Sequence, residues 1–345
     1  MKVGAARAAA VDWVERHAAG EPGFVGAYFS GSTIYLPDHA EVPIGSDVDV
    51  MVISEQEEAS GRTKFMHRGT LIEASHHPWS RLASLDTVPS AHSLRLDSII
   101  ADPSGRLATV QSAVARQYAE PGRVRRRCRA IWEGTGQALR ELDPSAPWPD
   151  QVMTWAFRTS WTAVLVLVAA IRNPTVRLRY LAAREVLTDY GLSQLYPDLL
   201  GLFGCLDLTP DVADHHLDEL SQTFDIAAEA ARTGFAFSSD ITQIARPVAI
   251  DGIREQIGLG NHREVMFWLV ATYTRCHKIL ATDAPELERK RRPALEAMLA
   301  DLGIRSSTDL VSRADAVIAF LPRLWEAVEA ILAVGSTSPD SQAPN

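Results

Sequence analysis

Residues 47–54 read Asp-Val-Asp-Val-Met-Val-Ile-Ser, an acidic pair that opens an otherwise apolar run. The run is rich in β-branched residues and alternates at its start, which is typical of a strand. Side chains two positions apart on a strand share one face, with Cα atoms about 6.6 Å apart. Asp47 and Asp49 can therefore converge on one hard cation such as Mg²⁺, which prefers oxygen ligands. Without such a partner, two buried carboxylates would be costly.

A third acidic residue lies in the apolar stretch Leu71-Ile72-Glu73-Ala74, which also has the character of a strand. Taken alone, Glu73 fits a solvent-exposed strand residue, because strand acids are usually exposed. The acidic pair on an upstream strand favours a joint site instead. Three carboxylates on adjacent strands can hold two metal ions about 3.5–4 Å apart, as in phosphoryl-transfer sites.

An earlier apolar and aromatic run, residues 23–31, predicts a strand that ends at a Gly-Ser turn. Gly31 would let backbone N–H groups approach a phosphate, and Ser32 would add a hydroxyl donor. Taken alone, Gly-Ser more often marks an ordinary turn. The pair becomes informative only through its place ahead of the acidic residues.

The two parts of the chain differ in pattern. Residues 1–120 predict a helix at 3–17, strands within 23–31, 47–54, 69–77 and 94–105, and a helix capped by Ser104 that runs to about 118. From about residue 121 the pattern is helical, over 123–142, 149–172, 177–190, 211–233, 261–282 and 307–333. Asn261 and Glu264 resemble a capping box. We predict an α+β domain over 1–120, an all-helical domain over 121–334 and a disordered tail over 335–345.

Composition limits the function classes. The chain has 345 residues, with 34 Lys+Arg against 43 Asp+Glu, so its net charge of −9 argues against broad nucleic-acid binding. Three widely spaced cysteines form no CxxC pair, which disfavours a disulfide framework. Charged residues interrupt the N-terminal segment, and the longest apolar run has nine residues, against about 20 needed to span a bilayer. We therefore expect a soluble cytoplasmic protein with no membrane partner.

Three features follow one another along the chain: a strand ending in Gly-Ser, an acidic pair opening a strand, and an acid in a later strand. This order resembles the nucleotidyltransferase superfamily with the polymerase-β-like fold. Within it, the chain is similar to bacterial proteins that resemble aminoglycoside nucleotidyltransferases. The resemblance covers about residues 24–75. It implies a mixed sheet flanked by helices for the catalytic domain, 1–120, and acceptor binding for the helical domain, 121–334.

The resemblance also implies roles for six residues. Catalysis and Mg²⁺ binding fall to Asp47, Asp49 and Glu73, and nucleotide binding falls to Gly31, Ser32 and Ser46. Two features depart from the family pattern. Fourteen residues, Thr33–Ser46, separate Ser32 from Asp47, and Ile34–Pro37 stand where a further glycine is often found. Both departures concern the shape of the phosphate loop and leave the three acidic residues untouched.

The implied reaction is nucleotidyl transfer, in which a hydroxyl attacks the α-phosphorus of a nucleoside triphosphate, ATP being the expected donor, and pyrophosphate leaves. The expected acceptor is a small molecule such as an aminoglycoside antibiotic. Two alternatives are a protein hydroxyl as acceptor and a non-catalytic nucleotide-binding regulatory module. The general base is Glu73, Asp102 or an acid of the helical domain, although Asp102 also fits a type I turn. A homodimer is a further option.

Other features have simpler explanations. Arg123–Arg129 could neutralise a triphosphate, and Arg177 and Arg179 could reach an active site, but solvated helix faces explain both. The histidine pairs at 76–77 and 215–216 lack the further ligands of a zinc site. The aromatic residues Trp155, Trp161, Phe267 and Trp268 have helical spacing and favour core packing over an acceptor pocket.

Overall fold

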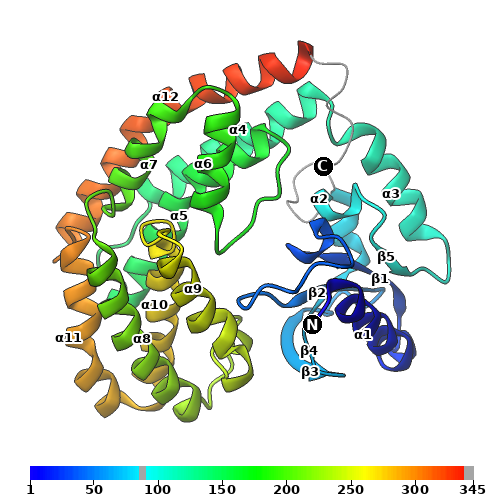
Figure 1. The fold of residues 1–345 in the computed structure, drawn as a ribbon, viewed down its shortest axis with the longest axis horizontal. Coiled ribbons are helices and arrows are strands. Elements are labelled where there is room, and N and C mark those ends of the chain that lie inside the picture. The colour runs from blue at the N-terminus through cyan, green and yellow to red at the C-terminus, as the bar shows by residue number, and fades with distance from the viewer. Residues whose placement is uncertain (85–90, 338–345) are drawn as a thin grey trace. The chain divides into compact units, whose positions relative to one another are not determined.

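The computed structural model describes residues 1–84 and 91–337 (Figure 1). The chain divides into two compact units: Met1–Arg123 with Gly234–Gly252, and Val124–Thr233 with Ile253–Asn345. An α+β region with a five-stranded sheet precedes an all-helical region, which confirms the predicted fold class. At the predicted tail, helix α12 (Ser307–Thr337) includes the first three residues, and 338–345 lie outside the described residues.

A mixed sheet forms the centre of the first unit. Its strands are β1 (Phe24–Ser30), β2 (Val48–Ser54), β3 (Gly61–His67), β4 (Thr70–Pro78) and β5 (Ile99–Ala101). They lie in the order β3-β4-β2-β1-β5, with β2 and β4 parallel and the other neighbours antiparallel. Four strands match the ranges expected from sequence, with β4 extending one residue beyond its range to Pro78. The fifth, β3, was not expected, because its sequence GRTKFMH lacks a clear apolar alternation.

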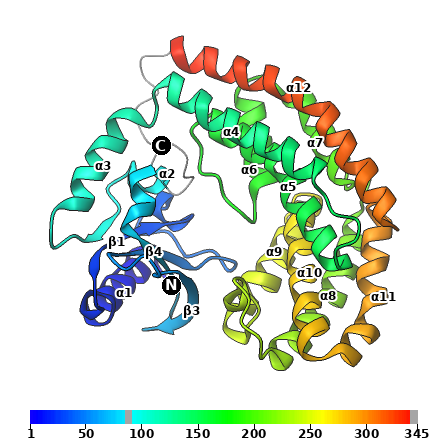
Figure 2. The ribbon, with the colours of Figure 1, turned by 180° about the vertical axis from the view of Figure 1, so that it is seen from behind.

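Helix α1 (Val3–Arg16) covers one face of this sheet (Figures 1 and 2). Its small apolar residues recur at helical spacing and pack on alternate residues of β2, namely Val48, Val50 and Val52. Because strand side chains alternate between faces, Asp49 points to the face opposite α1. The packing of α1 thereby decides which face of the sheet carries the acidic residues.

Helix α2 (Ala91–Leu94) lies between β4 and β5 in the chain, and helix α3 (Arg106–Gln117) follows β5. The N-cap position is Gly105, with a φ of 72°, one residue after the predicted Ser104, whose hydroxyl accepts a hydrogen bond from the Arg106 amide at 3.4 Å. The carboxylate of Asp102 accepts a hydrogen bond from the Ala108 amide at 2.8 Å. An acidic side chain therefore satisfies an N–H group of the first turn, where it also favours the positive end of the helix dipole.

Residues 234–252 belong to the first unit although they lie within the helical half of the sequence. They form three short segments, the 3₁₀ turns η5 (Ser238–Asp240) and η6 (Gln243–Ala245) and the π-helical turn η7 (Pro247–Asp251). Both η5 and η6 contact β3. A Cβ atom on Gly252 would lie 2.6 Å from the Cα of Gly45, so the end of this segment closely approaches the loop before Asp47.

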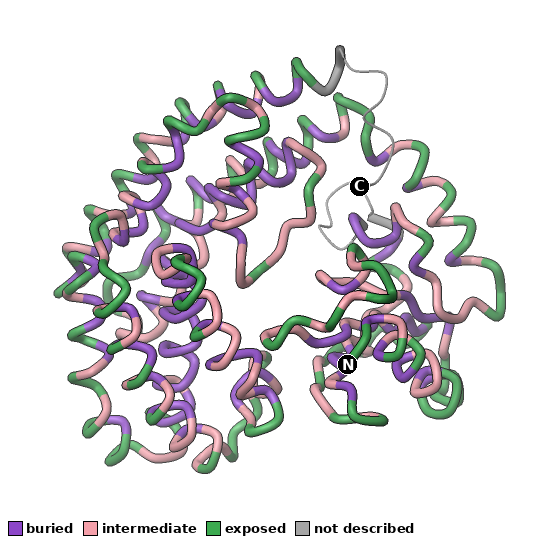
Figure 3. Tube along the Cα trace, viewed as in Figure 1, coloured by how far each residue is buried: buried purple, intermediate pink, exposed green. Residues whose placement is uncertain are grey.

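The second unit is built from long helices. The helices of the C-terminal half are α4 (Pro121–Arg140), α5 (Trp148–Ala169), α6 (Arg179–Asp189), η4 (Ser193–Leu195), α7 (Tyr196–Phe203), α8 (Pro210–Ala230), α9 (Gly252–Gly258), α10 (Met266–Asp283), α11 (Pro285–Asp301) and α12. Helix α10 packs against α5, α8 and α11, and nearly all of its residues are buried (Figure 3). Its first turn is apolar, and later turns also bury polar residues, among them Arg275 and His277, as happens in a helix at the centre of a core.

The predicted capping box of α10 is wrong. The helix begins at Met266, and Glu264 is fully buried instead of capping the helix. Its carboxylate accepts hydrogen bonds from Arg184 at 2.8 Å and from the Tyr196 hydroxyl at 2.7 Å. The buried charge is therefore paired and hydrogen-bonded, which is the condition for tolerating it in a core.

Among the described helices, α5 is long and apolar enough to cross a membrane by length and composition alone. Within its most apolar 18-residue window, 72% of the residues are buried inside the structure. The core helix of a soluble protein meets the same criterion, so this is weak evidence for a membrane span.

Candidate active site

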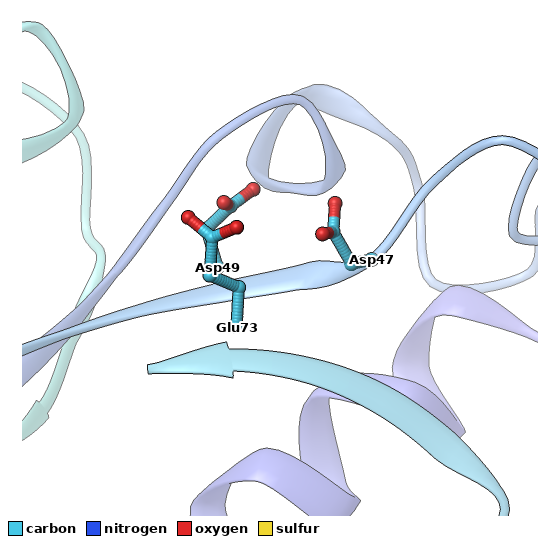
Figure 4. Close-up of side chains that lie close together, drawn as sticks. All are labelled: Asp47, Asp49 and Glu73. Atoms are coloured by element: carbon cyan, nitrogen blue, oxygen red, sulfur yellow. The ribbon is translucent and has the colours of Figure 1, made fainter. Parts of the chain in front are cut away.

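Three carboxylates converge on the sheet face opposite α1 (Figure 4). Asp49 of β2 and Glu73 of β4 are direct neighbours in the parallel register, and Asp47 lies immediately before β2. Each side chain offers an oxygen within 4.8 Å of the others, and the carboxylates of Asp47 and Glu73 are buried. In residues 1–84 and 91–337 this is the one group of three or more acidic, His or Cys side chains placed to share a cation.

The Gly31-Ser32 turn, expected from the sequence to approach a phosphate, follows the end of β1 next to this cluster. Ser30, the last residue of β1, pairs with Asp49 across the sheet, and Gly31 follows it with a φ of 72°. Ser32 precedes the short 3₁₀ turn η2 (Thr33–Tyr35) and makes no side-chain cap. The amide of Ser46 donates to the Pro43 carbonyl at 2.9 Å in a turn directly before Asp47. Gly31 thus lies beside the Asp49 carboxylate, and Ser32 follows it in the chain.

The long loop after Ser32 is tied to the start of α1. The guanidinium of Arg7 donates to the carbonyls of Thr33 and Leu36, the latter at 2.9 Å, and to Asp38 at 2.8 Å. The amide of Gly4 also donates to the Asp38 carbonyl at 3.0 Å. The first turns of α1 therefore hold this long loop in place. The loop in turn supplies a carbonyl acceptor for an amide at the N-terminus of α1 that has no partner within the helix.

Two basic side chains of β3, both unexpected from sequence, face the carboxylates. Lys64 is opposite Glu73 in the antiparallel register, and its ammonium group hydrogen-bonds both Asp47 and Glu73. Arg62, two residues earlier on the same face, lies 3.6 Å from Glu73. Ser30, Asp49, Glu73 and Lys64 thus form one row across four neighbouring strands.

A fourth acidic residue, Asp240 of η5, completes the surroundings of these basic side chains. It forms an ion pair with Arg62 and lies 3.7 Å from the ammonium nitrogen of Lys64. In the sequence, Asp240 lies in the helical half of the chain, 178 residues after Arg62. No local pattern could have associated Asp240 with the sheet.

Burial and charge shift the pKa values of this cluster in defined directions. Burial raises the pKa of Glu73 above its ordinary value, against the opposing effect of Lys64 and Arg62. Burial alone would lower the pKa of Lys64, but the carboxylates of Asp47 and Glu73 outweigh it and raise that pKa. Lys64 is therefore a permanent cation held between two of the three acidic residues.

The donor set fits a divalent metal ion. Carboxylate oxygens are the ligands that Mg²⁺ prefers, and three of them lie within reach of one position. The Lys64 ammonium group touches two of them, which shows directly that this arrangement accommodates a positive charge. Asp47, Asp49 and Glu73 could therefore hold a metal ion.

The remaining candidates have structural roles. The Asp102 carboxylate is engaged at the start of α3. Arg179 is buried, donates to the Ser160 hydroxyl at 2.7 Å and lies 4.5 Å over the ring of Phe267. The arginine run at the start of α4 includes the buried Arg127, while Arg125 pairs with Glu329. The aromatic residues Trp155, Phe267 and Trp268 are buried in the helical unit.

No protein-family model matches the chain, and no curated protein matches it significantly. The mixed sheet, the following helices and the acidic triad are compatible with a polymerase-β-like nucleotidyltransferase.

Proposed function

We propose that the first unit is a polymerase-β-like nucleotidyltransferase that moves a nucleoside monophosphate from a nucleoside triphosphate to a hydroxyl group. The observation that carries the proposal is the convergence of Asp47, Asp49 and Glu73 on one sheet face, beside the Gly31-Ser32 turn. A structural cluster would need only enough charge to balance Lys64 and Arg62. A phosphoryl-transfer site needs carboxylates next to a backbone turn that can approach a phosphate.

In this proposal the acceptor oxygen forms a bond to the α-phosphorus while the bond from that phosphorus to the bridging oxygen breaks. Pyrophosphate leaves with the electron pair, and the hydroxyl proton passes to a carboxylate. Bound Mg²⁺ supplies neutralisation of charge on the attacking and leaving oxygens. Gly31 and Ser32 bind the phosphates, with Ser46 beside the acidic pair.

Glu73 is the carboxylate that we assign to the proton. It is buried on the same sheet face as Asp47 and Asp49, within reach of a hydroxyl group activated there. The second unit is assigned to acceptor recognition, and a small molecule such as an aminoglycoside is the proposed acceptor. The alternative of a regulatory module without catalysis does not explain why three carboxylates remain gathered beside the turn.

The deciding experiment incubates the purified chain and Mg²⁺ with each labelled nucleoside triphosphate. The acceptors are aminoglycosides, lincosamides and the chain itself, and products are read by mass. A gain of one nucleoside monophosphate identifies donor and acceptor together. The double variant Asp47→Asn, Asp49→Asn should lower transfer by about 100-fold or more, since even residues that only orient metal ligands are worth 10–100-fold. Undiminished transfer by that variant would show that the site is elsewhere.

A further inference from the structure

Lys64 occupies an unusual place for a lysine. Its side chain is 4% exposed, and its ammonium group hydrogen-bonds one oxygen of Asp47 and one of Glu73. Burying an ammonium group is costly unless carboxylates compensate it. Here two of the three proposed metal ligands provide that compensation, so Lys64 and a divalent cation would share the same partners.

A second acceptor for Lys64 lies beside it. An oxygen of Asp240 is 3.7 Å from the lysine nitrogen, already within ion-pair range. The other oxygen of Asp240 pairs with Arg62, which anchors this carboxylate to the same strand. Lysine has a flexible four-carbon stem and three rotatable donors, so a short movement of its end group exchanges one set of partners for another.

The segment that carries Asp240 is held against the sheet at two points. Its η5 and η6 turns contact β3, and Gly252 at its end approaches the backbone of Gly45 so closely that a Cβ there would lie 2.6 Å from a Cα atom. Gly45 lies two residues before Asp47. Asp240 is thus fixed next to the acidic cluster by backbone packing on both sides.

We propose that Lys64 is an exchangeable internal cation, which bridges Asp47 and Glu73 and, when a divalent cation binds there, moves onto Asp240. Asp240 is then a positioning residue, because it acts on the metal site through Lys64. The inference rests on the proposed function only in taking Asp47, Asp49 and Glu73 as a divalent-cation site.

The exchange explains two features at once. Without Lys64, the carboxylates of Asp47 and Glu73 would repel each other in a buried position, so the lysine holds the ligands in place. Without Asp240, a displaced Lys64 ammonium group would either stay close to the incoming cation and repel it, or be buried without a carboxylate partner. The two residues therefore have opposite effects on metal affinity, and the effect of Asp240 depends on Lys64.

The test is a double-mutant cycle on Mn²⁺ affinity, measured by calorimetry and by the paramagnetic resonance signal of free Mn²⁺. The proteins are the full chain, Lys64→Met, Asp240→Asn and the double variant. We expect Lys64→Met to bind Mn²⁺ about 10-fold more tightly and Asp240→Asn about 10-fold more weakly, the size of a coupling near 1.4 kcal/mol. In the Lys64→Met background, Asp240→Asn should change the affinity by less than about twofold.

The non-additive result separates the exchange from a general field effect. If Asp240 acted only as a nearby negative charge, Asp240→Asn would weaken Mn²⁺ binding equally with and without Lys64, and the proposal would be overturned. Lys2→Met is the matched control, because it removes one lysine that pairs with the exposed Glu41. It should leave Mn²⁺ affinity unchanged.

Stability gives an independent reading. In EDTA, Lys64→Met should melt below the unmodified chain, and Mn²⁺ should raise its Tm by more than it raises that of the unmodified chain. If Lys64→Met does not fold, Asp240→Asn must still weaken Mn²⁺ binding, and unchanged binding would overturn the proposal. The variant Asp47→Asn, Glu73→Gln distinguishes failure of the proposed metal site from failure of the Lys64 exchange. If this variant binds Mn²⁺ normally, the metal site is assigned to the wrong residues. If it loses Mn²⁺ binding but the double-mutant cycle is additive, the metal site stands and only the Lys64 exchange is refuted.

Discussion

Gly31 and Asp49 lie so close that a Cβ atom on the glycine would be 1.7 Å from Oδ2 of the aspartate. Gly31 also has a φ of 72°, in the left-handed region that favours glycine. The close approach arises because Ser30 pairs with Asp49 across the sheet, so the next residue turns directly over that side chain. The Gly-Ser motif and the acidic pair are therefore one structural unit.

Gly31→Ala should disable the site by displacing the Asp49 carboxylate. The expected result is a loss of Mn²⁺ affinity and nucleotidyl transfer of at least about 10-fold, with a stability loss above the 1–2 kcal/mol that left-handed backbone alone costs. Gly105→Ala is a matched control, because Gly105 has the same φ of 72° and nothing within 4 Å of its added Cβ. If both variants retain equal metal affinity, the contact with Asp49 has no functional role.

Arg7 should determine the shape of the phosphate loop without touching the metal ligands. Arg7→Met removes the donors to Thr33, Leu36 and Asp38, and charged hydrogen bonds of this kind contribute about 1.5–3 kcal/mol each. We expect a KM for the nucleoside triphosphate raised by about 10-fold, with Mn²⁺ affinity unchanged. Steady-state kinetics and calorimetry check the two halves of this expectation.

The control for Arg7 is Arg16→Met, which removes an arginine of the same helix that pairs with Asp12. Its KM should match that of the unmodified chain. An equal rise in KM for both variants would trace the effect to α1 stability and not to the loop.

The sequence predicts those parts of the site that depend on local patterns and misses those that depend on contacts between residues far apart in the chain. Asp47, Asp49 and Glu73 were predictable because each stands in an apolar strand pattern that makes its charge conspicuous. The fold class followed from the change of periodicity near residue 121. These signals are local, and the strand and helix periods express them directly.

The basic side chains were missed for a physical reason. Edge strand β3 has one polar face, so its sequence has no apolar run to reveal it. The only local signal for it is Gly69, which permits a tight turn; in the structure Arg68 and Gly69 both have positive φ, as in two-residue hairpins. Recognising that hairpin would have placed Lys64 opposite Glu73. Asp240 could not be found this way, because its approach depends on tertiary packing 178 residues away from Arg62.

Asp102→Asn separates the two roles considered for this residue. The structure engages its carboxylate with the Ala108 amide, and asparagine caps helices about as well as aspartate. We expect kcat within about threefold of the unmodified chain, whereas loss of a general base costs about 10²–10⁴-fold. Asp102→Ala should lower the free energy of unfolding by about 1 kcal/mol. A large fall in kcat for Asp102→Asn would instead make Asp102 the base in place of Glu73.

Two buried histidines should make the helical unit sensitive to acid. Burial lowers the pKa of His277 below its ordinary 6.5 despite Glu288 at 3.2 Å, and burial likewise lowers that of His216 despite Asp301 at 2.8 Å. Nε2 of His277 is also buried without a hydrogen-bond partner in the described structure, so a proton there would have no acceptor. The folded state therefore disfavours the charged form of both rings.

Because the folded pKa values are depressed, the unfolded chain binds more protons as the pH falls through 6.5. The stability from the neutral rings is complete above that pH and is lost as the pH drops toward the folded values, by about 1.4 kcal/mol for each unit of depression. Urea unfolding from neutral pH to about pH 5 should show this decline, and His277→Gln should flatten it. His39→Gln, at an exposed position far along the chain from both rings, should leave the slope unchanged. A slope that His277→Gln fails to reduce would place the acid sensitivity in other groups.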